Sequence, residues 1–188
     1  MTERRLPTDE IILTQYKKNR RDGFRLLYQK YSERILSVCR RYSADDGQAM
    51  DYFQDVMLRV NDRLETYRFK GEGSLLLWLS RVTVNLIVDK MRDENKVEIL
   101  DLSDIGREIE DTSYEDSEKI PVEEMIKMID RLSQVKREVF NLHCIDGYSH
   151  KEVGTMLGIT EDGASSLLSK ARKDLSEMIK EYLNKNQC

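Results

Sequence analysis

The sequence predicts an all-α protein made of two small helical domains joined by an acidic linker. Three observations favour this fold class. Apolar residues recur at intervals of three and four along most of the chain, which is the period of an amphipathic helix. Only 2 Pro and 9 Gly occur in 188 residues, too few for the many turns of a β-sandwich. Charged residues make up 35% of the chain, and one stretch with a strong excess of acidic residues lies between two segments with helical periodicity.

Residues 1–96 are predicted to form the first domain, a four-helix bundle. A short helix spans about 9–18, with Thr8 as its N-cap. Three longer apolar stripes follow, and each helix alone is too weak to be stable, so the four should pack together. The stripes consist of Phe24, Leu27, Tyr28, Tyr31, Ile35, Val38, Cys39 and Tyr42; Ala49, Phe53, Val56, Val60 and Leu64; and Leu75, Trp78, Leu79, Val82 and Leu86, with Trp78 interpreted as a core residue.

Residues 97–120 are predicted to be the linker. They hold 2 Lys and Arg against 9 Asp and Glu, whereas residues 1–96 hold 19 against 15 and residues 121–188 hold 10 against 11. Their few apolar residues keep no long helical period, so the segment cannot bury enough surface to fold alone. Its charge could also mimic a nucleic-acid backbone inside a basic channel. The net charge of −4 argues against a protein that simply coats DNA.

Residues 121–188 are predicted to form the second domain, which ends in a helix-turn-helix. Pro121 suits the first position of a helix, and Ser133 can cap the helix after it. Ser149 and Glu152 fit a capping box in front of a helix at about 150–157, and a second helix spans about 161–182. A short turn containing glycine joins two such helices in a helix-turn-helix. A helical hairpin for protein contacts is the alternative.

Two surface features of the first domain are candidates for function. The first is a polar face on the helix that carries the second apolar stripe. It is interpreted as a docking face for a basic or coiled-coil partner, and the alternative is an ordinary solvated surface. The second is the loop 67–73, where two aromatic residues alternate with basic ones ahead of a helix that carries more cations. Aromatic rings that stack on bases, and cations for phosphates, are what capture of single-stranded DNA needs. The residues concerned are Asp51, Gln54, Asp55, Leu58 and Arg59 on the face, and Tyr67, Arg68, Phe69, Lys70, Arg81, Asn85, Lys90 and Arg92 in and after the loop.

Enzyme chemistry finds no support in the sequence. It contains no Walker loop, GxGxxG, HExxH or Ser/His/Asp set. Cys39, Cys144 and Cys188 form no CxxC pair, and Cys144 makes at most a weak cluster with His143 and His150. We therefore expect no catalysis, no cofactor and no metal. No run of about 18 apolar residues occurs and no signal core follows the N-terminus, so a cytoplasmic location without membrane insertion is expected.

Four segments, taken in order, resemble bacterial RNA polymerase sigma factors of the extracytoplasmic-function group of the sigma-70 family. They read FRLLYQKYSERILSVCRRY, QDVMLRV, FKGEGSLLLWLSRVTVNLIVDKMR and VKREVFNLHCIDGYSHKEVGTMLGIT with LSKARKDL. The resemblance covers almost the whole chain. It implies that the first domain is sigma region 2 and the second is sigma region 4, and that the chain directs promoter-specific transcription initiation. It also implies three partners: core RNA polymerase through its β′ clamp and β flap, promoter DNA, and an anti-sigma factor.

The resemblance also implies a role for each candidate residue. Contact with the β′ clamp is assigned to Asp51, Gln54, Asp55 and Arg59. Capture of the melted minus-10 strand is assigned to Phe69, Lys70, Arg81, Asn85, Lys90 and Arg92. Recognition of the minus-35 duplex is assigned to Thr160, Ser165, Ser166, Ser169, Lys170, Arg172 and Lys173.

The recognition helix departs from the family pattern at Gly163, Ser165 and Leu167, where relatives often carry Thr, a cation, and Arg or Gln. Each lost bidentate base contact is worth about 1–3 kcal/mol, so minus-35 reading should be weaker here or depend on DNA shape. Two other interpretations stay open. One is a stand-alone helix-turn-helix regulator, and the other is a degenerate sigma-like decoy or scaffold.

Overall fold

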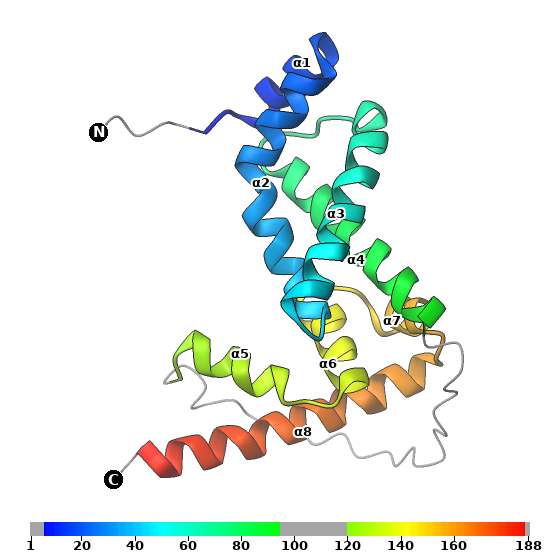
Figure 1. Ribbon diagram of the computed structural model, residues 1–188. Coiled ribbons are helices and arrows are strands. Elements are labelled where there is room, and N and C mark those ends of the chain that lie inside the picture. Colours follow the sequence, from blue (N-terminus) through cyan, green and yellow to red (C-terminus); the bar gives the residue numbers. More distant parts are fainter. Residues whose placement is uncertain (1–5, 95–119, 187–188) are drawn as a thin grey trace. The chain divides into compact units, whose positions relative to one another are not determined.

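The structure, a computed structural model, describes residues 6–94 and 120–186, and in these ranges it is helical with no strand (Figure 1). The chain divides into two units, Met1–Asp93 and Glu94–Cys188. The prediction of an all-α fold is therefore confirmed. Residues 97–119 of the predicted linker lie outside the described residues. Its last residue, Ile120, is buried in the core of the second unit.

The first unit contains four α-helices and one short 3-10 turn. They are α1 (Asp9–Lys18), α2 (Arg20–Tyr42), α3 (Asp46–Arg63), η1 (Leu64–Thr66) and α4 (Ser74–Glu94). Side chains that accept a backbone N–H fix where the first three helices begin: Thr8 accepts from Ile11, and Asn19 and Asp45 act in the same way for α2 and α3. The predicted cap at Thr8 is confirmed.

The three apolar stripes supply most of the core of this unit, but Phe24, Tyr28, Val38 and Trp78 are not fully buried. The second stripe is buried along its whole length, from Ala49 to Leu64. Tyr28 is 46% exposed and meets Phe53 edge-on, with ring centroids 5.9 Å apart. Trp78, predicted to be a core residue, is only half-buried and packs against Tyr67 with ring centroids 5.0 Å apart. That prediction was wrong, because Trp78 covers the base of the loop 67–73.

A glycine allows α1 and α2 to approach closely. A Cβ atom added to Gly23 would lie 2.2 Å from the Cα atom of Tyr16, far inside van der Waals contact. The tyrosine can therefore cross α2 only where no side chain stands. Its hydroxyl then donates to the backbone carbonyl of Asn61 at 2.7 Å, which ties α1 to α3.

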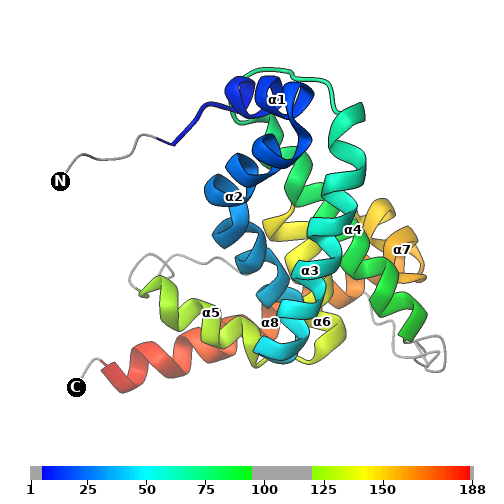
Figure 2. The ribbon, with the colours of Figure 1, turned by 45° about the horizontal axis from the view of Figure 1, so that its top comes forward.

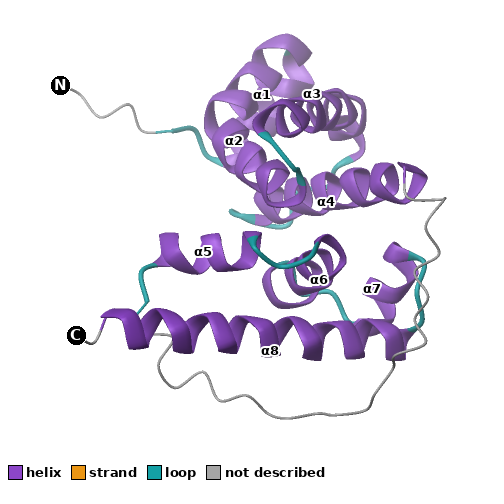
Figure 3. Ribbon diagram, turned by 60° about the horizontal axis from the view of Figure 1, so that its bottom comes forward, coloured by secondary structure: helices purple, strands orange, loops and turns teal. Residues whose placement is uncertain are grey.

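The second unit is built on one long helix. The unit contains α5 (Val122–Asp130), α6 (Gln134–Phe140), a π-helical turn η3 (Asn141–Ile145), α7 (His150–Leu157) and the long helix α8 (Glu161–Asn186). Figure 3 shows α5, α6 and α7 along one side of α8. Residues from α5 and α8 share a core, namely Met128, Leu132, Ala171, Leu175 and Ile179 together with Ile120.

Two local predictions for this unit need correction. Pro121 stands at the N-cap, one residue before α5, instead of at the first helical position. Ser133 stands at the N-cap of α6, but its side chain makes no capping hydrogen bond. The backbone of Ser133 still accepts from Arg137 N–H at 2.9 Å, so the helix begins where expected without help from the hydroxyl.

Candidate functional site

The face of α3 assigned to core polymerase presents mixed polar and apolar side chains. Asp51, Gln54 and Arg59 are exposed, whereas Asp55 is half-buried. Leu58 projects from the same helix and is 66% exposed. We call the surface formed by Asp51, Gln54, Asp55 and Arg59 the α3 face.

An apolar groove borders the α3 face. It has a volume of about 860 Å³ and is formed by α2 and α3, with lining residues Arg20, Arg21, Phe24, Tyr28, Met50, Phe53, Gln54, Met57, Leu58 and Asn61. The sequence prediction missed this groove because Phe24 and Tyr28 fall on a helical stripe and were interpreted as core. The exposure of Tyr28, Met50 and Leu58 suits the groove to contact with another helix.

A second hollow of about 620 Å³, next to the α3 face, is strongly charged. It is lined by Asp55, Leu58, Arg59, Asp62, Leu86, Asp89, Lys90, Arg92 and Asp93. Lys90 donates to Asp55, and Arg92 donates to Asp89 at 3.2 Å. Two of the cations assigned to the minus-10 strand, Lys90 and Arg92, are therefore engaged with carboxylates.

The two aromatic residues of the loop 67–73, which we call the aromatic loop, differ in burial. Tyr67 is half-buried, and its hydroxyl lies 2.7 Å from Ser74 Oγ. Phe69 is 42% exposed, and Lys70 beside it is also exposed. Figure 2 shows the segment between η1 and α4 passing beside α1. The loop thus presents one aromatic ring, that of Phe69, and not two.

The other residues assigned to the minus-10 strand are spread along α4. Arg81 and Asn85 are both exposed and lie one turn apart on the same side of the helix. Lys90 is sixteen residues beyond Ser74, about 24 Å along the helix axis. The structure therefore places Phe69 and Lys70 near one end of α4, and Lys90 and Arg92 at the other.

The helix-turn-helix formed by α7 and α8 is as predicted. The capping box is present, because Ser149 N–H donates to Glu152 Oε2 at 2.8 Å and Glu152 N–H donates to Ser149 Oγ at 3.3 Å. A Cβ atom added to Gly154 would lie 2.9 Å from the backbone oxygen of Ile159. The close approach thus involves the backbone of the turn between α7 and α8. Thr160 caps α8 by accepting from Gly163 N–H at 3.0 Å.

The N-terminal part of α8 is less cationic and less open than expected. Thr160, Lys170, Arg172 and Lys173 are exposed. Ser165, Ser166 and Ser169, assigned to the same minus-35 duplex, are half-buried and so less open to DNA than a reading residue should be. The hydroxyl of Ser169 donates to the backbone of Ser165 at 3.1 Å. Two exposed acids, Glu161 and Asp162, stand in the first turn.

His143 in η3 and His150 at the start of α7 stack on each other. Their ring centroids are 4.2 Å apart, and His143 Nδ1 lies 2.8 Å from the Tyr148 carbonyl oxygen. Burial, followed by the charge of His143, lowers the pKa of His150, so we expect a neutral imidazole at pH 7. Within the described ranges, no three His, Cys, Asp or Glu side chains gather as metal ligands would. Nor is any helix there both long enough and apolar enough to cross a bilayer.

Comparisons with known proteins identify both units. The family model for Sigma-70 region 2 matches residues 27–97, and that for Sigma-70 region 4 matches residues 123–175. The chain belongs to the sigma-70 family of RNA polymerase sigma factors. Curated relatives place it in the extracytoplasmic-function (ECF) group, whose members are transcription initiation factors with a DNA-binding helix-turn-helix.

Three relatives illustrate the extent of the similarity. The ECF sigma-E factor of Escherichia coli K12 is 22% identical over 190 residues, covering 95% of this sigma factor and 97% of its own chain. SigM of Mycobacterium tuberculosis is 24% identical, covering 94% and 87%. SigE of Mycolicibacterium smegmatis is 23% identical, and this chain spans 61% of its length. Among solved structures, CnrH in complex with the cytosolic domain of CnrY has a TM-score of 0.48 at 18% identity and covers 92% of this chain and 97% of its own.

Proposed function

We propose that this ECF sigma factor directs promoter-specific initiation by three contacts. The α3 face, with the apolar groove beside it, binds the β′ clamp of core RNA polymerase. The aromatic loop and the exposed side of α4 capture the melted minus-10 strand, and the N-terminal part of α8 docks on the minus-35 duplex. The chain itself performs no chemical step and acts in the cytoplasm, where the polymerase is.

Phe69 is the observation that supports the proposal most. A phenyl ring that is 42% exposed stands beside Lys70 on a loop that leads into a helix with Arg81 and Asn85 on its open side. Such a ring can receive an unpaired base by stacking, worth about 1–3 kcal/mol per base, while the neighbouring cations contact the backbone. Stacking would offset part of the cost of unpairing the duplex, about 1–2 kcal/mol per step.

The charge of the free chain fits this division of labour. With a net charge of −4, and with Lys90 and Arg92 engaged by Asp55 and Asp89, the free subunit should bind DNA weakly. The polymerase would then supply most of the attraction for phosphates. We also propose an anti-sigma factor as the partner of the free subunit, together with a contact between region 4 and the β flap.

The test is transcription in vitro on a genomic DNA library by core polymerase, with and without this chain, with start sites mapped. We expect new start sites that share one upstream motif. A stand-alone regulator would instead protect specific DNA without polymerase, and a decoy would bind polymerase and create no start sites. Either outcome would overturn the proposal.

The decoy interpretation keeps a structural argument of its own. Glu161 and Asp162 place two negative charges at the end of α8 that would enter the groove, and Ser165, Ser166 and Ser169 are short and half-buried. This arrangement favours weak reading of the minus-35 duplex. The same transcription assay, on templates whose minus-35 region is scrambled, decides how much of the specificity remains in α8.

A further inference from the structure

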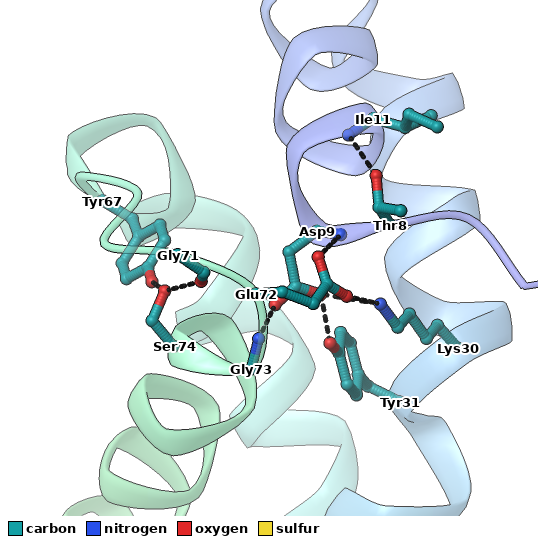
Figure 4. Close-up of polar contacts among 10 residues, drawn as sticks. All are labelled: Thr8, Asp9, Ile11, Lys30, Tyr31, Tyr67, Gly71, Glu72, Gly73 and Ser74. Carbon is teal, nitrogen blue, oxygen red and sulfur yellow. Dashed lines mark hydrogen bonds and ion pairs between the residues drawn. The ribbon is translucent and has the colours of Figure 1, made fainter.

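A buried carboxylate joins α1 to the aromatic loop. Asp9, the first residue of α1, is 0% exposed. Its Oδ2 accepts the backbone N–H of Gly73 at 2.9 Å, and its Oδ1 accepts from Lys30 Nζ at 2.8 Å and from the Tyr31 hydroxyl. Figure 4 shows these groups converging on one carboxylate. Asp9 is thus satisfied by three donors from two other segments of the chain.

Glu72, in the aromatic loop, makes the reciprocal contacts to α1 and α2. Its Oε2 accepts the backbone N–H of Asp9 at 2.9 Å, and its Oε1 accepts from Lys30 Nζ at 2.8 Å. The two segments therefore exchange hydrogen bonds in both directions: each offers a backbone N–H to a carboxylate of the other. Lys30 on α2 lies between the two carboxylates and is bonded to both. We call Asp9, Lys30 and Glu72 the loop clamp.

The rest of the loop is held locally by Ser74. Its hydroxyl contacts Tyr67, accepts from Lys70 N–H at 3.3 Å and donates to the Gly71 carbonyl at 2.5 Å. Residues on both sides of Phe69 are thus fixed to the start of α4, while the loop clamp fixes the other end of the loop to α1 and α2. The Phe69 ring itself stays exposed.

The buried carboxylate is charged. Burial alone would raise the pKa of Asp9, but the hydrogen bonds from Lys30, Tyr31 and Gly73 outweigh it and hold the pKa below its usual value. A fully buried charge is costly unless every lone pair is satisfied. Moving the loop away from α1 would remove the Gly73 donor from this buried carboxylate, so the arrangement disfavours other positions of the loop.

We propose that Asp9, Lys30 and Glu72 are positioning residues for promoter opening, which hold the aromatic loop in the conformation in which Phe69 receives an unpaired minus-10 base. The inference rests on the proposed function of Phe69. Its physical basis is pre-organisation: the apparent affinity of the loop for a base is proportional to the fraction of molecules in which the loop already has the receptive conformation.

The experiment measures two steps separately with holoenzyme assembled from core polymerase and the full chain. Closed-complex affinity is measured by DNA binding at low temperature, and opening by the rate of 2-aminopurine fluorescence increase in the minus-10 region. Glu72→Ala removes two bonds of the loop clamp at a side chain that is 57% exposed, so folding should survive. The matched control is Glu65→Ala, which removes an exposed carboxylate on η1 outside the clamp.

We expect Glu72→Ala to slow opening about tenfold, because it lowers the receptive population, with closed-complex affinity within twofold of wild type. Lys30→Met should also slow opening, and it should lower thermal stability, because it leaves the buried Asp9 carboxylate without its ion-pair partner. Lys30→Arg, which keeps a donor cation, should restore both. Glu65→Ala should behave as wild type. Equal opening rates for Glu72→Ala and wild type would overturn the inference, as would a uniform loss of both steps that follows thermal stability.

A double-mutant cycle separates this inference from the function on which it rests. If the loop clamp acts through Phe69, Glu72→Ala should add little to Phe69→Ala. If Phe69→Ala leaves opening unchanged, the proposed role of the loop is wrong. If Phe69→Ala slows opening but Glu72→Ala and Lys30→Met do not, that role stands and the positioning inference is wrong.

Discussion

Asp55 on α3 and Lys90 on α4 form an ion pair, although the sequence assigned one to polymerase and the other to DNA. Their side chains are 40% and 39% exposed, so the pair is a surface interaction worth at most about 1 kcal/mol. It nevertheless neutralises both groups in the free subunit. If Asp55 binds a cation on polymerase as proposed, that contact would release Lys90, and the two proposed interfaces would share this residue pair.

A charge exchange separates the two roles of this pair. We expect Asp55→Lys alone to weaken co-purification with core polymerase at least tenfold, with a loss of stability below about 1 kcal/mol. Combining it with Lys90→Asp re-forms the ion pair in reverse and should restore stability but not polymerase binding. Recovery of polymerase binding in the double variant would show that Asp55 acts only through Lys90. Asp46→Lys, at an exposed acid outside the α3 face, is the control.

Asp9 of the loop clamp, and Tyr31, which donates a hydrogen bond to it, make the stability of the first unit depend on pH at both ends of the scale. The pKa of Asp9 lies below its usual 3.8, so its contribution is present above that value and is lost as pH falls below it. Burial, followed by the bond to Asp9, raises the pKa of Tyr31 from 10.0 to about 12. The contribution of Tyr31 is therefore complete below pH 10 and is lost as pH rises toward 12.

Tyr31→Phe tests the alkaline part of this dependence. We expect the free energy of unfolding in urea, monitored by the fluorescence of Trp78, to fall less between pH 10 and pH 12 in the variant than in wild type. Trp78 is the single tryptophan of the chain, so the signal reports the first unit. Burial also raises the pKa of the Cys39 thiol to about 12, which adds the same slope to both proteins. Parallel curves for the two proteins would refute the role of the Tyr31 hydroxyl.

Glu138 lowers the stability of the second unit. It is 6% exposed, its Oε1 has no hydrogen-bond partner among the described residues, and burial raises its pKa. Its ionised form is thus disfavoured, and its effect on stability worsens as pH rises through the carboxylate range. We expect Glu138→Gln to stabilise the unit by about 1 kcal/mol at pH 7, measured by circular dichroism. The control is Glu177→Gln, at an exposed residue of α8, and a destabilised Glu138→Gln would contradict the interpretation.

The recognition helix offers a test by gain of function. Ser165 is half-buried near the start of α8, where relatives often carry a cation. If α8 docks in the major groove, Ser165→Lys should tighten holoenzyme binding to minus-35 DNA and steepen its salt dependence by about one unit. Lys180 lies far along α8 and is exposed, so Lys180→Gln should leave that slope unchanged. Unchanged affinity and slope for Ser165→Lys would favour the decoy interpretation.

Local sequence signals predicted much of this fold. Thr8, Ser149 and Glu152 act within three residues of their partners, so propensity and spacing were sufficient. Stripes of apolar residues gave the helices and most of the core. They failed at Trp78, because a helical period does not show that the Tyr67 ring, in the loop before α4, packs against a half-buried Trp78.

Non-local contacts could not be predicted in this way. Asp9, Lys30 and Glu72 are separated by 21, 42 and 63 positions, and nothing in a window of the sequence marks them as partners. The pairing of Asp55 with Lys90 is similar, since each residue alone suggested a solvated surface or an external partner. The candidate residues were identified from their chemical types and from the family motifs they match. The contacts that hold or neutralise them depend on the packed helices.

Permanganate footprinting tests most directly whether Phe69 captures an unpaired base. Holoenzyme with wild-type chain should make thymines in the minus-10 region reactive. Phe69→Ala should reduce this reactivity at least fivefold, in keeping with a stacking contact of about 1–3 kcal/mol, while closed complexes still form. Leu77→Ala, which truncates a side chain that is 68% exposed on α4, should react as wild type. Equal thymine reactivity in wild type and Phe69→Ala would contradict the proposed capture of the minus-10 strand.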